Sequence, residues 1–176
     1  MFKTIAIIIA VLLGGVLIYA ATKPDNFRVE RSISVNAPPE KIAALISDFH
    51  LWNGWSPWEK MDPDMKRTFS GSPSGNGAVY EWNGNSKVGQ GRMEITESSP
   101  SKIAIKLDFI KPFEGHNVAT FTLVPQGDAT IVTWAMDGPS PYIAKVIGVF
   151  CNMDHMIGKD FETGLANLKT ATEKQG

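Results

Sequence analysis

The feature that most constrains the fold is a series of six short strand-like segments separated by breaks rich in turn residues. In one of them, Ile103, Ile105 and Leu107 alternate with polar residues such as Lys102 and Lys106. This period of two is typical of a strand with one buried face. The breaks between the segments are rich in Gly, Ser, Asn and Pro, which favour tight turns between antiparallel strands. We therefore predict strands at residues 65–70, 78–83, 89–97, 102–109, 117–124 and 130–137.

A strand and a helix precede this series, and a long helix follows it. Residues 27–35 alternate in the same way, and Pro39 and Glu40 then provide the proline-led, acidic first turn of a helix. After the last strand, Ser140 and Pro141 are typical of an N-cap and a first helical residue. An apolar stripe at helical spacing follows for about thirty residues. The pattern predicts an α+β fold, with a curved antiparallel sheet wrapped around a long C-terminal helix.

The N-terminal residues 5–21 form an uncharged apolar run. Its length lies at the lower limit for a helix that spans a bilayer, and it exceeds the usual core of a secretory signal. The positions where a signal would be cut, after Ala20 or Ala21, lack a small residue at −3. We expect a single-pass transmembrane anchor, with a cleaved signal peptide as the alternative, and the side of the membrane stays open. The expected division is an anchor (1–22), a linker (23–26) and one folded domain (27–174).

Composition and motifs argue against several classes of function. Lys and Arg number 17 against 18 Asp and Glu, so the basic excess typical of nucleic-acid binding is lacking and no nucleic-acid partner is expected. Cys151 is the only cysteine, and the three histidines lack metal-site spacing, so we expect no metal and no cofactor. The sequence contains no nucleophile elbow or phosphate loop, and no catalytic residue is assigned. His116 is the best candidate for a general acid or base.

Three stretches of the chain resemble a known family. They are Val29-Glu30-Arg31-Ser32-Ile33 with the junction 36–41, the loop 46–58 with its three tryptophans, and the tail 158–169. Together with the order of elements, they resemble the START-related superfamily called SRPBCC, in its polyketide cyclase/dehydrase-like branch. The resemblance implies a helix-grip fold with a cavity that accepts lipids or other apolar molecules. It does not imply an enzyme, because most members carry no assigned reaction.

The candidate ligand-binding residues are mainly aromatic. Large rings line apolar pockets, and Trp and Tyr also offer a polar N–H or O–H group to a ligand. The same rings also fill protein cores, and the sequence leaves both interpretations open. We expect the ligand to lie beneath residues 146–161 of the final helix. The residues expected to line the cavity are Trp52, Trp55, Trp58, Tyr80, Trp82, Phe109, Phe121, Trp134, Met153 and Ile157.

Arg31 is an anomaly, because the alternation of its strand places it on the apolar face. An unpaired charge on that face would be costly. Arg31 is therefore a ligand-binding residue, for a carboxylate or a phosphate, or one half of an internal salt bridge, or a residue at a strand end that reaches solvent. Asp137 and Glu114 are the candidate acids for such a bridge.

These features favour a membrane-anchored domain that holds a lipid-like or other apolar small molecule in an internal cavity. A first alternative is a polyketide cyclase- or dehydratase-like enzyme that acts in the same cavity through His116 or a buried acid. A second alternative is a partner-binding protein whose cavity is filled by its own side chains. The lack of catalytic motifs favours a role other than catalysis.

Overall fold

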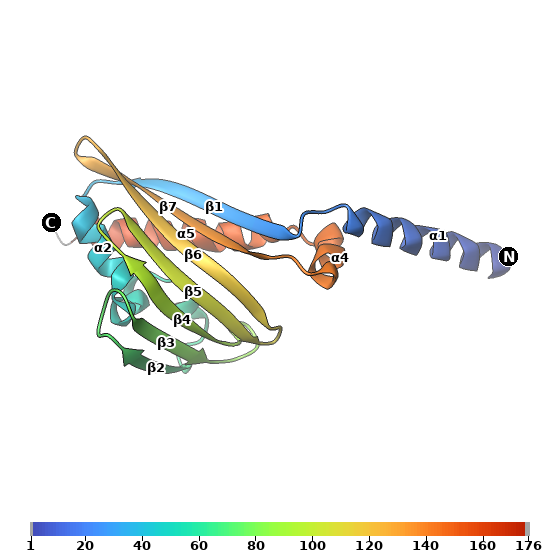
Figure 1. Cartoon of the computed structure of the whole chain (residues 1–176), viewed down its shortest axis with the longest axis horizontal. Coiled ribbons are helices and arrows are strands. Elements are labelled where there is room, and N and C mark those ends of the chain that lie inside the picture. Colours follow the sequence, from blue (N-terminus) through green and yellow to red (C-terminus); the bar gives the residue numbers. More distant parts are fainter. Residues whose placement is uncertain (1, 175–176) are drawn as a thin grey trace.

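The computed structural model describes residues 2–174, except for the side chain of Met153. Figure 1 shows a curved sheet with helices α2 and α5 on its concave side, while α1 projects away from the domain. The helices are α1 (Phe2–Ala21), α2 (Pro39–Ser47), the short 3-10 helix η1 (Phe49–Gly54), α3 (Trp58–Met61), α4 (Tyr142–Phe150) and α5 (Met153–Glu173). The strands are β1 (Asn26–Val35), β2 (Lys66–Gly71), β3 (Ala78–Asn83), β4 (Gln90–Ser98), β5 (Lys102–Lys111), β6 (Gly115–Gln126) and β7 (Ala129–Pro139).

The strands form one seven-stranded sheet in the order β1-β7-β6-β5-β4-β3-β2. All neighbouring strands are antiparallel, so β2 to β7 follow one another as hairpins and β1 lies beside β7. The alternation seen in the sequence sets which residues face inward. In β3, for example, Ala78, Tyr80 and Trp82 are buried, whereas Glu81 and Asn83 are exposed. The predicted α+β architecture of a sheet around a C-terminal helix is confirmed.

The core lies between the concave face of the sheet and the helices. Strand β7 contributes Val132, Trp134 and Met136, and α5 contributes Phe161 and Leu165, all of them buried. Helix α5 packs mainly against β1, and α2 packs against α5, β5 and β6. Because α5 rests near the β1 edge, the half of the concave face toward β2 is covered instead by η1 and α3 (Figure 1).

The final helix differs from the prediction. Instead of one helix of about thirty residues, the chain breaks at Cys151 and Asn152 into α4 and α5. The Asn152 side chain accepts a hydrogen bond of 3.0 Å from the His155 backbone N–H and so caps α5. Ser140 is not the N-cap of α4, because that helix starts later, at Tyr142. Helix α4 contacts α1, whereas α5 packs on the sheet, so the two parts of the predicted apolar stripe pack against different elements.

Helix α1 has twenty residues and is almost entirely exposed. It is long and apolar enough to cross a membrane, although a signal sequence would satisfy the same criteria. At the standard rise it is about 30 Å long, close to the thickness of the hydrocarbon layer.

Candidate functional site

The candidate site is a small cavity between the concave face of the sheet and the loop that carries η1 and α3. Its volume is about 90 Å³, well below the ~300 Å³ at which small-molecule pockets commonly begin. No residue of α4 or α5 lines it, so this cavity does not lie beneath residues 146–161, where we expected the ligand. The lining residues are Trp52, Trp58, Glu59, Met65, Tyr80, Trp82, Val88, Met93, Leu107, Ala119 and Trp134.

Trp82 reaches the cavity because its neighbour across the strands is a glycine. Trp82 of β3 is paired in register with Gly91 of β4. A Cβ atom at position 91 would overlap the Trp82 ring. The glycine therefore lets the indole lie flat across β4 and form one wall of the cavity.

Trp134 separates the cavity from α5. Its ring stacks on Phe161 with the centroids 4.2 Å apart, and it meets Trp58 edge to face at 5.6 Å. The Cζ3 corner of the indole points at α5, because a Cβ at Gly164 would lie 2.8 Å from that atom. The Nε1–H group lies on the opposite edge of the ring and therefore points away from α5.

The Trp134 Nε1 atom is buried and has no hydrogen-bond partner among the residues that the structure describes. The neighbouring indoles differ in this respect. Trp52 Nε1 donates to the Ile46 carbonyl and Trp82 Nε1 donates to the Val88 carbonyl, both at 2.9 Å. A buried donor without an acceptor costs about 1–3 kcal/mol. Among the tryptophans that line the cavity, Trp134 is thus the one whose indole N–H is fully buried and has no acceptor in the described part of the chain.

One carboxylate, Glu59, also lines the cavity, and both of its oxygens are engaged. Its Oε1 accepts a hydrogen bond of 2.5 Å from the Tyr80 hydroxyl, and its Oε2 accepts one of 2.7 Å from Arg67 Nε. Burial, and then the bond to Glu59, raises the pKa of the Tyr80 phenol. Only 7% of the Glu59 side chain is exposed, so Glu59 is a buried carboxylate that its two hydrogen bonds fix within an otherwise apolar wall. The position of Glu59 could not be predicted from the sequence, because the loop 49–65 has no regular period that indicates which side chains face inward.

The structure brings together five of the residues predicted to line the cavity: Trp52, Trp58, Tyr80, Trp82 and Trp134. The other predicted residues lie outside the lining. Trp55 and Phe121 are buried in the adjoining core, Phe109 packs on Trp82, and Ile157 packs half-buried against the core. The side chain of Met153 lies outside the described part of the chain. Alternation alone identified the inward face but not the part of that face left uncovered.

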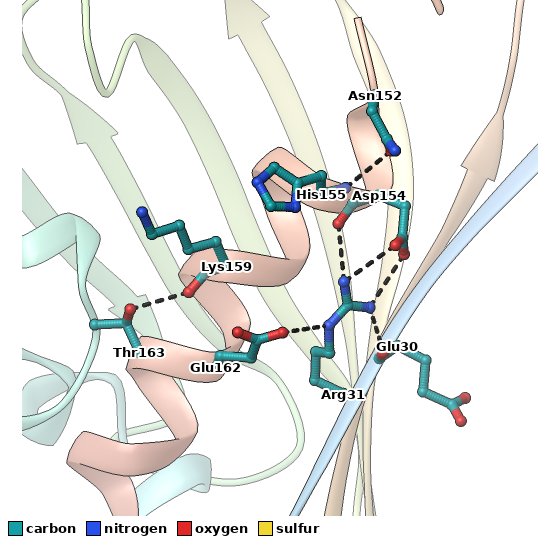
Figure 2. A network of polar contacts seen from close by, with 8 residues as sticks. All are labelled: Glu30, Arg31, Asn152, Asp154, His155, Lys159, Glu162 and Thr163. Carbon is teal, nitrogen blue, oxygen red and sulfur yellow. Dashed lines mark hydrogen bonds and ion pairs between the residues drawn. The ribbon is translucent and has the colours of Figure 1, made fainter.

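Arg31 lies away from the cavity and is held by α5 (Figure 2). Its two Nη atoms bond the Asp154 carboxylate at 3.1 Å, and its Nε bonds Glu162 at 2.8 Å. The Glu30 carbonyl accepts a further bond, so all three nitrogens are used. The interpretation as an internal salt bridge fits this arrangement, but the acids named for it, Asp137 and Glu114, are not the partners. These two acids instead contact Arg28 and His116, respectively.

His116, the best sequence candidate for acid–base chemistry, also lies outside the cavity. It is exposed on β6, where its Nδ1 pairs with Asp108 at 2.7 Å. That hydrogen bond lowers the pKa of the Asp108 carboxyl. The pair therefore stabilises the outside of the hairpin between β5 and β6. In the described residues, no three His, Cys, Asp or Glu side chains are grouped as a metal site requires.

The fold agrees with a comparison against protein families. Residues 26–173 match the family described as polyketide cyclase / dehydrase and lipid transport. The chain belongs to this family. The resemblance to the SRPBCC superfamily seen in the sequence is thereby confirmed. No curated protein matches the sequence significantly.

Solved structures show the same fold at low identity. A protein from Rhodobacter sphaeroides has a TM-score of 0.61 at 16% identity, and the match covers 85% of this chain and 93% of that one. A protein from Chromobacterium violaceum has a TM-score of 0.59 at 16% identity, covering 86% and 99%. DynU16, from the dynemicin biosynthetic locus, has a TM-score of 0.57 at 16% identity, covering 86% and 48%. At these identities the likeness shows the fold alone.

Proposed function

We propose that this family member is a membrane-anchored binding protein that holds the apolar part of a lipid-like or other small molecule beside Trp134. The observation that carries the proposal is a nearly all-apolar cavity whose wall includes Trp134, an indole with a buried N–H that has no partner among the described residues. An apolar ligand with one oxygen acceptor complements both features. It would fill the space and accept the Trp134 hydrogen bond.

The size of the cavity limits what enters it. About 90 Å³ is smaller than the ~150 Å³ cavity known to hold benzene, so even one ring must displace something. Met65 and Met93 on the wall are flexible enough to make room by changing rotamer. Burying about 200 Å² of ligand at ~25 cal/mol per Å² contributes about 5 kcal/mol before ordering costs. Because ordering costs are subtracted from this sum, we expect weak binding, at about millimolar concentration, of one ring or of the end of a chain.

The state of Glu59 favours binding over catalysis in this cavity. A cyclase or dehydratase needs a group that can take or give a proton next to the substrate. Glu59 is the carboxylate on the wall, and the Tyr80 hydroxyl and the Arg67 guanidinium already occupy its two oxygens. His116 is remote from the wall. These contacts support a structural role for Glu59.

The proposal is tested by following the five tryptophan indole N–H signals in the NMR spectrum of the ¹⁵N-labelled full chain in detergent. The protein is titrated with acetophenone and with α-methylstyrene, which have the same shape but differ in the oxygen acceptor. Both are expected to shift signals of the cavity tryptophans, and acetophenone is expected to move the Trp134 signal most. If neither ligand, nor a fatty acid or an isoprenol, shifts any of these signals, the cavity does not bind such molecules.

Trp134→Phe is the matched variant, because it keeps an aromatic ring on the wall and removes the N–H group together with the five-membered ring that carries it. We expect it to weaken acetophenone binding about fivefold, the equivalent of one ordinary hydrogen bond. The affinity for α-methylstyrene should stay nearly the same. Trp82→Phe serves as the control, since the Trp82 N–H already bonds the Val88 carbonyl. Equal losses for both ligands in Trp134→Phe would contradict the role of the N–H.

A further inference from the structure

Helix α4 is attached to the end of α1 that adjoins the folded domain. The Tyr142 hydroxyl at the start of α4 donates a hydrogen bond of 2.9 Å to the Leu17 carbonyl. Ala20, three residues further along α1, is completely buried although the rest of α1 is exposed or half-exposed. Figure 1 shows α4 beside the last turns of α1, at the end of the sheet. The two helices thus form one unit.

Polar contacts fix how α4 is rotated. Lys145 in its middle is only 8% exposed and pairs with Asp25 of the linker. Lys23 donates a hydrogen bond of 2.6 Å to the Gly148 carbonyl. Both contacts come from the segment directly after α1. They hold the polar side of α4 against the linker and turn its other side outward.

The outward side of α4 is apolar. Ile143, Ile147 and Phe150 are spaced four and three residues apart, which places them on one face of a helix. Ile143 is 67% exposed and Phe150 is 74% exposed. Tyr142 is also exposed, and Lys145, the only charged residue of α4, is turned away. A water-facing helix normally carries charged residues on this face.

The contact with α1 sets the depth of this face in a membrane. Leu17 lies four residues before the end of α1, which corresponds to about 6 Å along the helix axis. If α1 spans the hydrocarbon layer, the first turn of α4 lies at the boundary of that layer. Tyr19 and Lys23 then lie at the same level, as is common for Tyr and Lys at a membrane interface.

We propose that α4 is an interfacial helix whose Ile143, Ile147 and Phe150 face inserts into the same bilayer that α1 spans. This inference rests on the proposed membrane anchor. It follows from the continuity of the α4 face with α1 and from the depth of the Leu17 contact. The bilayer then holds the folded domain at two adjoining elements, which limits its rotation about α1.

Cys151 supplies the reporter for the test. It is exposed, it directly follows α4, and it is the only cysteine of the chain. The full chain is labelled there with the environment-sensitive dye NBD and reconstituted into phosphatidylcholine vesicles. We expect blue-shifted emission and about twofold or greater quenching by lipids brominated near the top of the acyl chains, the depth of an interfacial helix. Flotation of the same vesicles checks the anchor separately.

The control carries the dye at the opposite end of the domain, in a chain with Cys151→Ser and Asp128→Cys. Asp128 lies in the exposed hairpin between β6 and β7, far from α4 in Figure 1. Its dye should emit as in water and escape quenching. The double variant Ile143→Gln/Ile147→Gln tests the face itself: it should still float, but the dye at Cys151 should lose most of its blue shift.

The outcomes separate the two proposals. Vesicles that float with a water-like dye at Cys151 overturn the insertion of α4 and leave the anchor standing. Protein that does not float overturns both. A blue-shifted dye that brominated lipids do not quench, with a shift that grows with protein density, means that a second copy covers this face, and that also overturns the proposal.

Discussion

At the scale of single residues, Arg31 and Asp154 join the first strand to the first turn of α5. The guanidinium lowers the pKa of the Asp154 carboxyl, chiefly through the hydrogen bonds between them. A carboxyl whose pKa is lower in the folded state than in the unfolded chain adds stability above its unfolded value, about 3.9. That contribution is lost as the pH falls through the lowered folded value. The pair therefore stabilises the protein at neutral pH and not in strong acid.

Asp154→Asn should lower the free energy of unfolding at pH 6–7, and its difference from the natural protein should shrink as the pH falls below about 4. Urea unfolding of the detergent-solubilised protein between pH 7 and pH 3 measures this. Asp128→Asn, in an exposed hairpin, is the control and should show no such dependence. If the effect of Asp154→Asn persists unchanged in an Arg31→Met background, the pairing with Arg31 is not its cause.

Two glycines in helices should respond to alanine in opposite directions. At Gly164 the new Cβ would lie 2.8 Å from the Trp134 ring and 3.2 Å from Pro57, and neither group can rotate away. We expect a loss of about 1–2 kcal/mol, since overpacking of ~1–3 kcal/mol exceeds the helix gain of up to ~1. At Gly148 the nearest atom is 3.9 Å away, and alanine should stabilise by up to ~1 kcal/mol. Thermal and urea unfolding compare the two, and a stabilising Gly164→Ala would contradict the proposed contact.

At the scale of elements, α5 depends on the sheet for its stability. It contains two glycines, each of which weakens an isolated helix by up to about 1 kcal/mol. Its buried stripe of Phe161, Leu165 and Leu168 packs on the concave face. Phe161 is central to that stripe, because it stacks on Trp134 with an interplanar angle of 5° and also meets Trp58.

Phe161→Ala is expected to cost about 3–5 kcal/mol of folding stability, the usual loss for a buried aromatic. Met156→Ala lies on the same helix at an exposed position and should change stability by no more than ~0.5 kcal/mol. Urea unfolding followed by circular dichroism compares the two. A loss below about 1 kcal/mol for Phe161→Ala would mean that the stripe does not hold α5 in place.

The elements also show what the sequence pattern can and cannot predict. The predicted strands lie within about two residues of the observed ones, because most strands have one buried face and therefore show period-two alternation. Strand β2, whose residues are almost all exposed, is the exception. The same reasoning merged α4 and α5, since apolar residues continue at helical spacing through the break. Asn152, a strong N-cap residue, was the local signal that a second helix begins there. The pattern indicates which positions are apolar, but it does not indicate whether they face the sheet or another helix.

At the scale of the whole molecule, the position of the cavity could not be derived from local patterns. Five of the predicted lining residues reach it, because strands β3 and β7 and the loop 49–65 carry aromatic side chains to the concave face. Which part of that face stays open depends on where α5 and η1 lie across it. Those positions are set by contacts such as Arg31 with Asp154 and Trp134 with Gly164, which join residues far apart in the chain.

The proposed anchor concerns the whole chain, and it predicts where the mature protein begins. We expect protein purified from membranes to retain residues 5–21 and to resist extraction by alkaline carbonate, as a spanning helix does. Intact-mass measurement and carbonate extraction test this. A mature protein that starts near Thr22 and is released by carbonate would show that α1 is a signal peptide.

Three glycines that lie under large side chains carry a consequence for how this protein can evolve. Gly91 lies under Trp82, Gly158 under Arg31, and Gly164 under Trp134, and a Cβ at any of them would strike the side chain above it. Trp134 has to shrink before Gly164 can be replaced without cost. At Gly91 the Asp108 carbonyl, 2.6 Å from such a Cβ, stays in the way whatever residue stands at 82, and at Gly158 the end of the Arg31 side chain can move aside. Descendants of one ancestor should therefore replace Trp134 before they replace Gly164. An alignment of relatives can be searched for the forbidden combination, such as tryptophan at 134 together with a residue larger than glycine at 164.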